Sequence, residues 1–275
     1  MQISIVIAQT PVVWDVEDNL TTLREVLDHT HSGDVVVLPE GLLSGYGDDL
    51  TPLDALDPAA VDNAVAQAAQ LARQKQVHIF CGSLLPMDGG WCNAGLFFSA
   101  EGDYQVYRKI NLAMNERGRL RPGNDLPMID IPHHAGRITA GIQLCREIRF
   151  PEQWRYLATA GAQLFIYLTN AANTHEPEGV WRSHLISRAA ENQRFLASAN
   201  IAHTDQHCPS MLVSPRGEVL GELAYGRSDV LRRTLNMEEI GSWYLGQRRL
   251  DVLSTAYHGH ADRYQNDLPA PAQVA

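Results

Sequence analysis

The most informative stretch of the chain is residues 141–152, which are Gly141-Ile142-Gln143-Leu144-Cys145-Arg146-Glu147-Ile148-Arg149-Phe150-Pro151-Glu152. Together with the residues from Arg137 onward, its apolar start predicts a buried strand that ends at Cys145. Pro151 suits the first turn of a helix, which we expect to run to about Ala160 and to stop at Gly161. A buried strand that leads into a helix is typical of α/β folds.

Strands and helices alternate on both sides of this stretch. Apolar runs predict strands at 3–8, 35–38, 77–84, 163–169 and 195–202, and periodic segments predict helices at 16–27, 58–76 and 179–193. The centre of the chain has mostly strands, at 91–99, 104–107, 128–131 and 137–144. Residues 210–214 and 218–223 predict a hairpin around Pro215-Arg216-Gly217, and a further strand and a short helix follow up to about Tyr244.

This order predicts one α/β domain over residues 1–256, because no internal repeat or linker interrupts it. Helices on one face of each sheet leave the two bare faces free to pack on each other. We therefore expect a four-layer α-β-β-α sandwich of two mixed sheets. From Tyr257 to Ala275 the composition turns polar and rich in proline and alanine, which predicts a C-terminal tail that wanders or docks on a partner subunit.

Composition and charge exclude several classes of protein. The formal net charge is −10, so most of the surface would repel a nucleic-acid backbone or an anionic membrane. No apolar run approaches the ~20 residues of a membrane-spanning helix. The opening run, residues 3–8, is too short for a secretory signal and has no positive flank. We expect a cytoplasmic protein that binds neither nucleic acid nor membrane.

The cysteines occur in separate sequence contexts, as Cys81, Cys92, Cys145 and Cys208. None belongs to a C-x-x-C or Cys/His ligand pattern. The histidines at 133–134 and 258–260 also lack partners at metal-ligand spacing, so we expect no metal. In a reducing cytoplasm the thiols stay free, and we interpret Cys81, Cys92 and Cys208 as small buried hydrophobic residues.

Three residues at the ends of predicted strands fit one chemistry: Glu40, Lys109 and Cys145. Taken singly, they have ordinary interpretations as a solvent-facing carboxylate, a surface lysine and a buried structural cysteine. Taken together, they supply a thiol nucleophile, a carboxylate base that removes its proton, and a cation where an oxyanion develops. A thiol at a strand-to-helix elbow also stands near backbone N–H groups that can bind the oxyanion.

The sequence around these residues resembles the nitrilase superfamily of carbon–nitrogen hydrolases, whose members place Glu, Lys and Cys in this order at strand ends. The resemblance extends from the first strand to about Leu220. Its blocks are Leu38-Pro39-Glu40 with Gly45-Tyr46 behind it, Tyr107-Arg108-Lys109-Ile110-Asn111-Leu112, residues 145–152, Trp181, Arg188-Ala189-Ala190-Glu191-Asn192 and Ser214-Pro215-Arg216-Gly217. Six blocks in the same order make the resemblance highly specific.

The resemblance implies further site residues. Glu116 precedes Arg121-Pro122-Gly123 at the spacing of a second family glutamate, which is thought to position substrate and steer protons. Asn170, at a strand end, and Tyr46 are expected to line the substrate pocket. Many members have an aromatic residue after the nucleophile, where this chain has Arg146. That arginine either places a cation at the pocket rim and favours an anionic substrate, or is solvated and contributes only its backbone N–H.

The implied activity is hydrolysis of a non-peptide C–N bond through a thioester on Cys145, with release of ammonia and without a cofactor. The substrate would be a small amide, an ω-amide or an N-carbamoyl compound. The block after Cys145 is closest to amidase-like branches, which favours an amidase over a nitrilase. A thioester acyltransferase and a non-catalytic member that binds a small acid are the other hypotheses. Similar proteins form two-fold dimers, and we expect a homodimer or larger homo-oligomer that uses Trp154, Tyr156, Leu157 and the helix segment 181–186.

Overall fold

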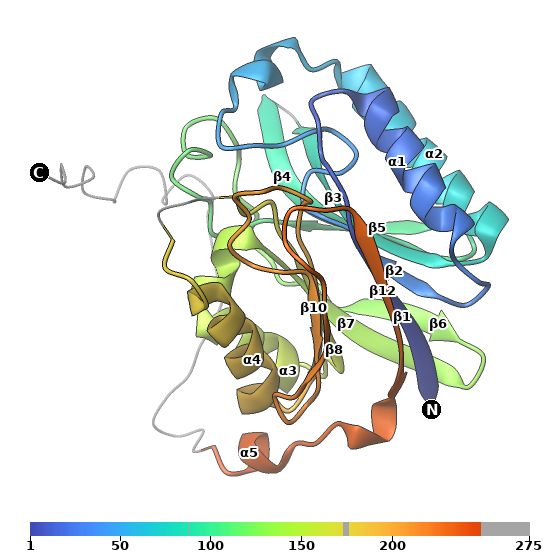
Figure 1. The fold of residues 1–275 in the computed structure, drawn as a ribbon, viewed down its shortest axis with the longest axis vertical. Coiled ribbons are helices and arrows are strands. Elements are labelled where there is room, and N and C mark those ends of the chain that lie inside the picture. The colour runs from blue at the N-terminus through green and yellow to red at the C-terminus, as the bar shows by residue number, and fades with distance from the viewer. Residues whose placement is uncertain (88, 173–175, 249–275) are drawn as a thin grey trace, which may run out of the picture.

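The structure is a computed structural model that describes residues 1–87, 89–172 and 176–248. Two six-stranded sheets lie face to face, and helices cover their outer faces (Figure 1). The expected four-layer α-β-β-α sandwich of mixed sheets is thereby confirmed. The domain boundary at residue 257 and the tail beyond it lie outside the described residues. Across the described ranges, no helix combines the length and the apolar character of a membrane span.

The first sheet has the strand order β12-β1-β2-β3-β4-β5. Its strands are β1 (Gln2–Gln9), β2 (Val35–Val37), β3 (His78–Met87), β4 (Gly90–Phe98), β5 (Tyr104–Arg108) and β12 (Asp229–Asn236). Strands β1, β2 and β3 are parallel, and the remaining pairs are antiparallel. The parallel pairs need crossover connections, which are α1 (Val16–Asp28) and α2 (Pro58–Lys75).

The second sheet repeats this plan with the order β11-β10-β9-β8-β7-β6. Its strands are β6 (Ile129–His133), β7 (Gly136–Leu144), β8 (Leu164–Leu168), β9 (Phe195–Ala199), β10 (Met211–Val213) and β11 (Val219–Glu222). Strands β7, β8 and β9 are parallel and are connected through α3 (Pro151–Thr159) and α4 (Val180–Asn192). The antiparallel pair β10–β11 is the expected hairpin.

Short helices complete the chain: η1 (Thr51–Ala55), η2 (Cys145–Arg149), η3 (Met237–Glu239) and α5 (Trp243–Gly246). Of these, η2 matters most for the site. The sequence predicts a simple turn between Cys145 and Pro151, whereas the structure has a helical turn that begins at the cysteine itself.

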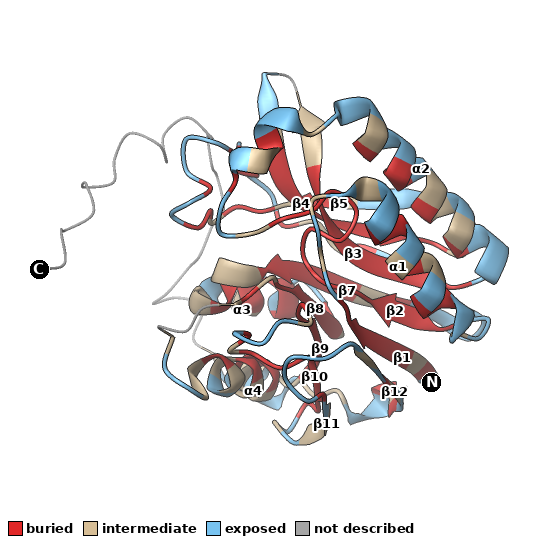
Figure 2. Ribbon diagram, turned by 45° about the horizontal axis from the view of Figure 1, so that its top comes forward, coloured by how far each residue is buried: buried red, intermediate tan, exposed pale blue. Residues whose placement is uncertain are grey.

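Alternate residues of each strand contribute to two separate cores. In β1, Ile3, Ile5 and Ile7 pack between the sheets, whereas Val6 and Ala8 pack beneath α1 and α2. Successive side chains of a strand point to opposite faces, and here both faces are covered, so the strand is apolar throughout. Figure 2 shows the buried residues concentrated in the strands and on the inner sides of the helices. Each fully buried aliphatic side chain contributes about 1.5–3 kcal/mol.

The helix residues that we expected at a dimer interface are mostly internal. Trp154 and Leu157 on α3 are fully buried, and Trp181 on α4 is 3% exposed. Trp154 packs edge-on against Phe165 of β8 at a centroid distance of 5.2 Å. The prediction that Trp154, Leu157 and Trp181 contact a partner is therefore wrong, because these large side chains form the core between the helices and the second sheet. Tyr156, at 38% exposure, faces outward.

Candidate active site

The backbone of the two residues before Glu40 holds it against strand β3. Beyond the end of β2, Leu38 N donates to the Phe80 carbonyl at 2.8 Å, and Gly82 N donates to the Pro39 carbonyl at 2.9 Å. A Cβ at Gly82 would lie only 2.5 Å from the Cα of Glu40. Glycine at this position is therefore required, because it lets the Glu40 segment approach the neighbouring strand.

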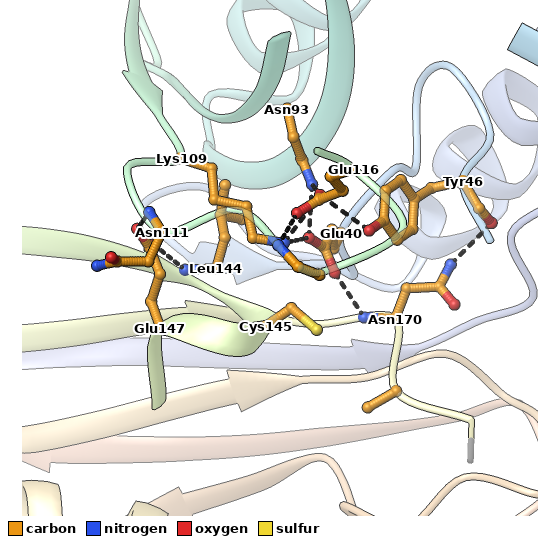
Figure 3. A network of polar contacts seen from close by, with 12 residues as sticks. Glu40, Tyr46, Asn93, Lys109, Asn111, Glu116, Leu144, Cys145, Glu147 and Asn170 are labelled. Atoms are coloured by element: carbon orange, nitrogen blue, oxygen red, sulfur yellow. Dashed lines mark hydrogen bonds and ion pairs between the residues drawn. The ribbon is translucent and has the colours of Figure 1, made fainter. Parts of the chain in front are cut away.

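Lys109 follows β5 directly and is fully buried. Its backbone N donates to the Asn93 carbonyl at 2.9 Å, and its carbonyl accepts a hydrogen bond from Gly123 N at 2.8 Å. Its Nζ lies 3.0 Å from Glu40 Oε1 and 2.9 Å from Glu116 Oε1 (Figure 3). A single buried ammonium thus joins two carboxylates from different loops.

Glu116 is also fully buried, although it comes from a loop. Four donors surround it: Tyr46 Oη at 2.9 Å, Asn93 Nδ2 at 2.6 Å, Lys109 Nζ at 2.9 Å and Ala113 N at 2.5 Å. These contacts give the loop residue Glu116 a fixed position inside the protein. The Asn93 amide also donates to Glu40 Oε1 at 2.7 Å, so it joins the same two carboxylate oxygens as the ammonium (Figure 3).

Cys145 comes from the other sheet, at the end of β7, and is only partly buried. Its φ of 39° lies in the left-handed region, which costs a non-glycine residue on the order of 1–3 kcal/mol. Tyr167 Oη donates to its carbonyl at 2.7 Å. Figure 3 shows the Cys145 side chain next to Glu40.

Of the three residues expected to contact substrate, two lie in the charged cluster and one does not. Asn170 N donates to Glu40 Oε2 at 3.0 Å, and its Nδ2 donates to the Tyr46 carbonyl at 3.1 Å. The Tyr46 ring lies 5.8 Å from Lys109 Nζ. The structure thus brings Asn170 and Tyr46 together with the charged cluster. Arg146 is outside this network: its partly exposed side chain has no hydrogen bond or ion pair within the described residues.

The two carboxylates have opposite electrostatic environments. Burial raises the pKa of Glu40, and the negative charge of Glu116 adds to this rise, while Lys109 opposes it. Burial acts in the same direction on Glu116, but the charge of Lys109 and the Asn93 and Ala113 donors outweigh it and lower its pKa. Two neighbouring carboxylates with pKa values pushed apart can take different catalytic roles.

The thiol and the lysine are both protonated at rest. Burial, followed by the nearby charge of Glu40, raises the pKa of Cys145 to about 12. Burial acts to lower the pKa of Lys109, but the charges of Glu116 and Glu40 outweigh it and hold that pKa above its ordinary value. The resting site therefore pairs a neutral thiol and an ammonium with two carboxylates.

Two residues of the site were not predicted from the sequence, Asn93 and Glu147. Asn93 lies in the middle of the apolar strand β4, and a single amide in such a strand needs buried partners. An asparagine within an apolar strand is therefore a sequence signal that could have predicted Asn93 as a site residue. Glu147 accepts a hydrogen bond from Leu144 N at 2.9 Å, as the third residue of a helix does in a capping box. Because Leu144 has no side-chain oxygen to complete the box, the sequence signal was weak.

Within the described ranges, no group of three or more His, Cys, Asp or Glu side chains is arranged to hold a metal ion. The cluster itself contains a thiol, two carboxylates and a buried ammonium.

The paired sheets and this cluster define a member of the nitrilase superfamily. The carbon–nitrogen hydrolase family profile matches residues 2–245, and the chain belongs to this family. Among its relatives, a hydrolase in the pqqF 5′ region of Pseudomonas protegens is 32% identical over 255 residues, covering 88% of this chain and 87% of the relative. A 2-oxoglutaramate amidase of Bacillus subtilis is 32% identical over 217 residues, covering 75% of this chain and 79% of the relative.

Solved structures show the same fold. An amidase from Nesterenkonia sp. AN1 superposes with a TM-score of 0.77 at 23% identity, covering 91% of this chain and 95% of the amidase. Nit3 of Saccharomyces cerevisiae, a member of branch 10 of the nitrilase superfamily, gives a TM-score of 0.75 at 23% identity, covering 92% of this chain and 97% of Nit3.

Proposed function

We propose that this protein hydrolyses the C–N bond of a small non-peptide amide, with Cys145 as nucleophile and Glu40 as general base. The observation that carries the proposal is the buried Lys109, which is hydrogen-bonded to both Glu40 and Glu116 beside a half-buried thiol. A surface lysine or a structural cysteine has no need of such an arrangement.

The first step forms a thioester. Glu40 removes the Sγ proton as the sulfur attacks the carbonyl carbon, because a thiol with a pKa of about 12 is not ionised on its own at neutral pH. The carbonyl electrons move to oxygen. When the tetrahedral intermediate collapses, the C–N bond breaks, Glu40 returns the proton to nitrogen, and ammonia leaves. Water then gives a proton to Glu40 and attacks the thioester. When this second tetrahedral intermediate collapses, the C–S bond breaks, the acid leaves, and Glu40 returns the proton to sulfur, which restores the thiol.

Lys109 stabilises the developing oxyanion. Two of its three N–H donors bind the carboxylates, and the third is available for the substrate oxygen. The backbone N–H of Arg146 lies in the first turn of η2, where N–H groups have no acceptor within the helix, and it serves as the second donor. Loss of one such donor typically slows a reaction by about 10²–10³-fold.

Glu116 keeps its negative charge throughout this cycle, because its pKa is lowered where that of Glu40 is raised. It holds Lys109 in position and keeps it protonated. Its bond from Tyr46 Oη connects it to Tyr46 and, through the Tyr46 carbonyl, to Asn170, and we expect these two residues to form a wall of the substrate pocket. The substrate amide would bind against that wall.

Among amides, we favour those that carry a carboxylate. The Bacillus subtilis and Paenarthrobacter nicotinovorans relatives are named 2-oxoglutaramate amidases, and a human relative is named an omega-amidase. The Nesterenkonia amidase, in contrast, has been crystallised with butyramide and acrylamide. In this chain Arg149 is paired with Glu176, whereas Arg146, next to the nucleophile, has no ion pair among the described residues. A free cation at this position would attract a substrate carboxylate.

An ammonia-release screen tests the proposed activity across small amides, ω-amides, N-carbamoyl compounds and nitriles. We expect release from amides and more from ω-amides, and none from the Cys145→Ala variant. Loss of an essential nucleophile typically costs on the order of 10⁴-fold or more, while the small change in volume preserves the fold. Ammonia release by the alanine variant above a few per cent of wild type would end the proposal.

The same preparation separates the other hypotheses. Turnover of nitriles alone would make the protein a nitrilase, and hydroxamate formation with hydroxylamine without hydrolysis in water would make it an acyltransferase. A non-catalytic member would show no turnover and no selectively fast alkylation of Cys145 by iodoacetamide in intact-mass measurements. Cys81, Cys92 and Cys208 are buried and serve as the slow internal controls.

Arg146→Gln tests the substrate preference. We expect kcat/KM for an ω-amide to fall by about 10-fold, or ~1.4 kcal/mol, while kcat/KM for an uncharged amide of the same length stays the same. An equal effect on both amides would assign Arg146 to the solvated surface and leave only its backbone N–H at the site.

A further inference from the structure

Glu147 is a buried carboxylate that the proposed mechanism does not use. It lies in η2, and its side chain is fully buried. Oε1 accepts hydrogen bonds from Tyr107 Oη at 2.6 Å, Ile110 N at 2.9 Å and Asn111 N at 3.1 Å, and Oε2 accepts one from Leu144 N at 2.9 Å. Gln153 Nε2 adds a longer contact to Oε1 at 3.4 Å. A buried carboxylate with this many donors keeps a fixed position.

The donors come from both sides of the active site. Residues 107–111, which include Lys109, supply three of them from the end of β5 in the first sheet. Leu144, which immediately precedes Cys145, supplies another from the end of β7 in the second sheet. Figure 3 shows Glu147 beside both segments. One carboxylate therefore connects the segment that carries the cation to the elbow that carries the thiol.

The elbow needs such a connection because its geometry is strained. Cys145 has a φ of 39°, and a residue with a side chain persists in this region only where its surroundings fix it. Two buried side chains hold the backbone before and after Cys145. Glu147 accepts the hydrogen bond of the preceding N–H, from Leu144, and Tyr167 Oη donates to the Cys145 carbonyl.

Both oxygens of Glu147 are needed for these contacts. The groups that face the carboxylate are donors on opposite sides. A glutamine has the same size but only one acceptor oxygen. Its NH₂ group would face either the Leu144 N–H or the donors of residues 107–111. A glutamine at position 147 would therefore lose the hydrogen bonds on one side, either to Leu144 or to residues 107–111, without opening a cavity.

We propose that Glu147 is a positioning residue for the reaction, which sets the orientation of Cys145 relative to Lys109 by bonding to the backbone next to each. It does not contact the substrate. The inference rests on the proposed function for its kinetic readout, but its effect on the thiol can be measured independently.

Glu147→Gln in the full-length protein tests this role. We expect kcat for ammonia release to fall by about 10²-fold, the effect of a displacement of about 1 Å in reacting groups, while KM changes less than about threefold. Tyr107→Phe removes one donor and leaves both oxygens and Leu144 bonded. Tyr107→Phe should lower kcat by about tenfold. It replaces Glu147→Gln as the test if the glutamine variant does not fold.

Tyr104→Phe is the matched control, because Tyr104 lies on the same strand but is 53% exposed. It should leave kcat and KM at wild-type values. The inference is overturned if Glu147→Gln folds with kcat within threefold of wild type, or if KM rises while kcat holds. It is also overturned if Tyr107→Phe has no more effect than Tyr104→Phe.

The iodoacetamide alkylation rate of Cys145 distinguishes this inference from the proposed function. We expect a rate about tenfold slower in Glu147→Gln and unchanged in Tyr104→Phe. If the wild-type protein releases no ammonia from any amide but the alkylation rates differ in this way, the positioning role stands and the proposed activity fails. Equal alkylation rates in all variants overturn the positioning role, whatever the substrate.

Discussion

The chain has only two lysines, and they lie in opposite environments. Lys75 pairs with Asp28 at the surface at 2.7 Å, where the side chains are 39% and 68% exposed. Lys109 is fully buried between two carboxylates. An ammonium is a compact charge with three donors, whereas a guanidinium is a larger planar fork. The buried position between Glu40 and Glu116 suits the compact ammonium of a lysine, whose separate N–H donors bind both carboxylates.

This contrast predicts the effect of removing Lys109. Lys109→Ala should abolish activity and lower the free energy of unfolding by about 3–5 kcal/mol, because two carboxylates would share a dry pocket without their cation. Lys109→Arg should not restore activity. Lys75→Ala is the control and should cost at most about 1 kcal/mol, as is usual for a surface pair. Urea unfolding and ammonia release measure both effects, and a near wild-type Lys109→Arg variant would contradict the assignment.

The raised pKa of Glu40 predicts the acid limb of the pH profile. The reaction needs the carboxylate form of Glu40, so kcat/KM should fall as the pH decreases through a pKa above the ordinary value of a glutamate. The pKa of Cys145, about 12, and that of Lys109, raised by Glu116 and Glu40, lie too high to cause a decline between pH 7 and 9. The profile should therefore be flat on its alkaline side in this range.

Glu40→Gln should abolish activity, and Glu17→Gln, at an exposed position on α1, should leave the profile unchanged. If activity instead increases toward acid pH, the protonated form of Glu40 is the active one. Glu116 would then be the general base in place of Glu40.

At the scale of the elements, strand ends carried most of the sequence information. Glu40 and Cys145 follow apolar runs and Lys109 follows the short predicted strand 104–107, and these segments end within one residue of the ends of β2, β5 and β7. Other features have no local signal. An acidic residue in a helical turn, such as Glu147, has the same sequence pattern whether it is solvated or buried. Its environment depends on three segments that meet only in the folded chain.

The close approach of β3 to the Glu40 segment makes Gly82 a sensitive position. Gly82→Ala would place a Cβ 2.5 Å from the Glu40 Cα. The resulting shift should cost about 1–3 kcal/mol of stability and lower kcat, because Glu40 would move away from Lys109. Gly246→Ala is the control, since its Cβ meets nothing within 4 Å. Chemical denaturation and kcat measure the two effects, and a Gly82→Ala variant with wild-type values for both would show that the backbone relaxes freely.

At the scale of the whole molecule, the sandwich brings the two halves of the site together. Glu40 and Lys109 follow strands of the first sheet, and Cys145 and Asn170 follow strands of the second. The sequence predicts two sheets but not how they are joined. Strand β12 pairs with β1 although more than 200 residues separate them, and such a pairing has no signal in local periodicity.

The assembly prediction changes with the structure, since the expected contact residues on α3 and α4 are internal. Exposed aromatic residues lie nearby instead. Trp243 and Tyr244 on α5 are 67% and 51% exposed, and Tyr156 on α3 is 38% exposed. Beside them is a hollow of about 680 Å³, lined by Pro151, Glu152, Arg155, Glu191, Tyr244, Gln247 and Arg248. Its two acidic and two basic side chains suit a two-fold contact, in which each patch meets its own copy.

We therefore expect a homodimer through this face, with a mass near twice 30.5 kDa in sedimentation at micromolar concentration. The contact would support the nucleophile, because Arg188 on α4 donates to the Ile148 carbonyl of η2 at 3.0 Å. Trp243→Glu should shift the protein toward monomer and lower kcat. Tyr104→Glu, which charges an exposed aromatic position on the other sheet, should do neither. A wild-type monomer with full activity would refute both the interface and its support of Cys145.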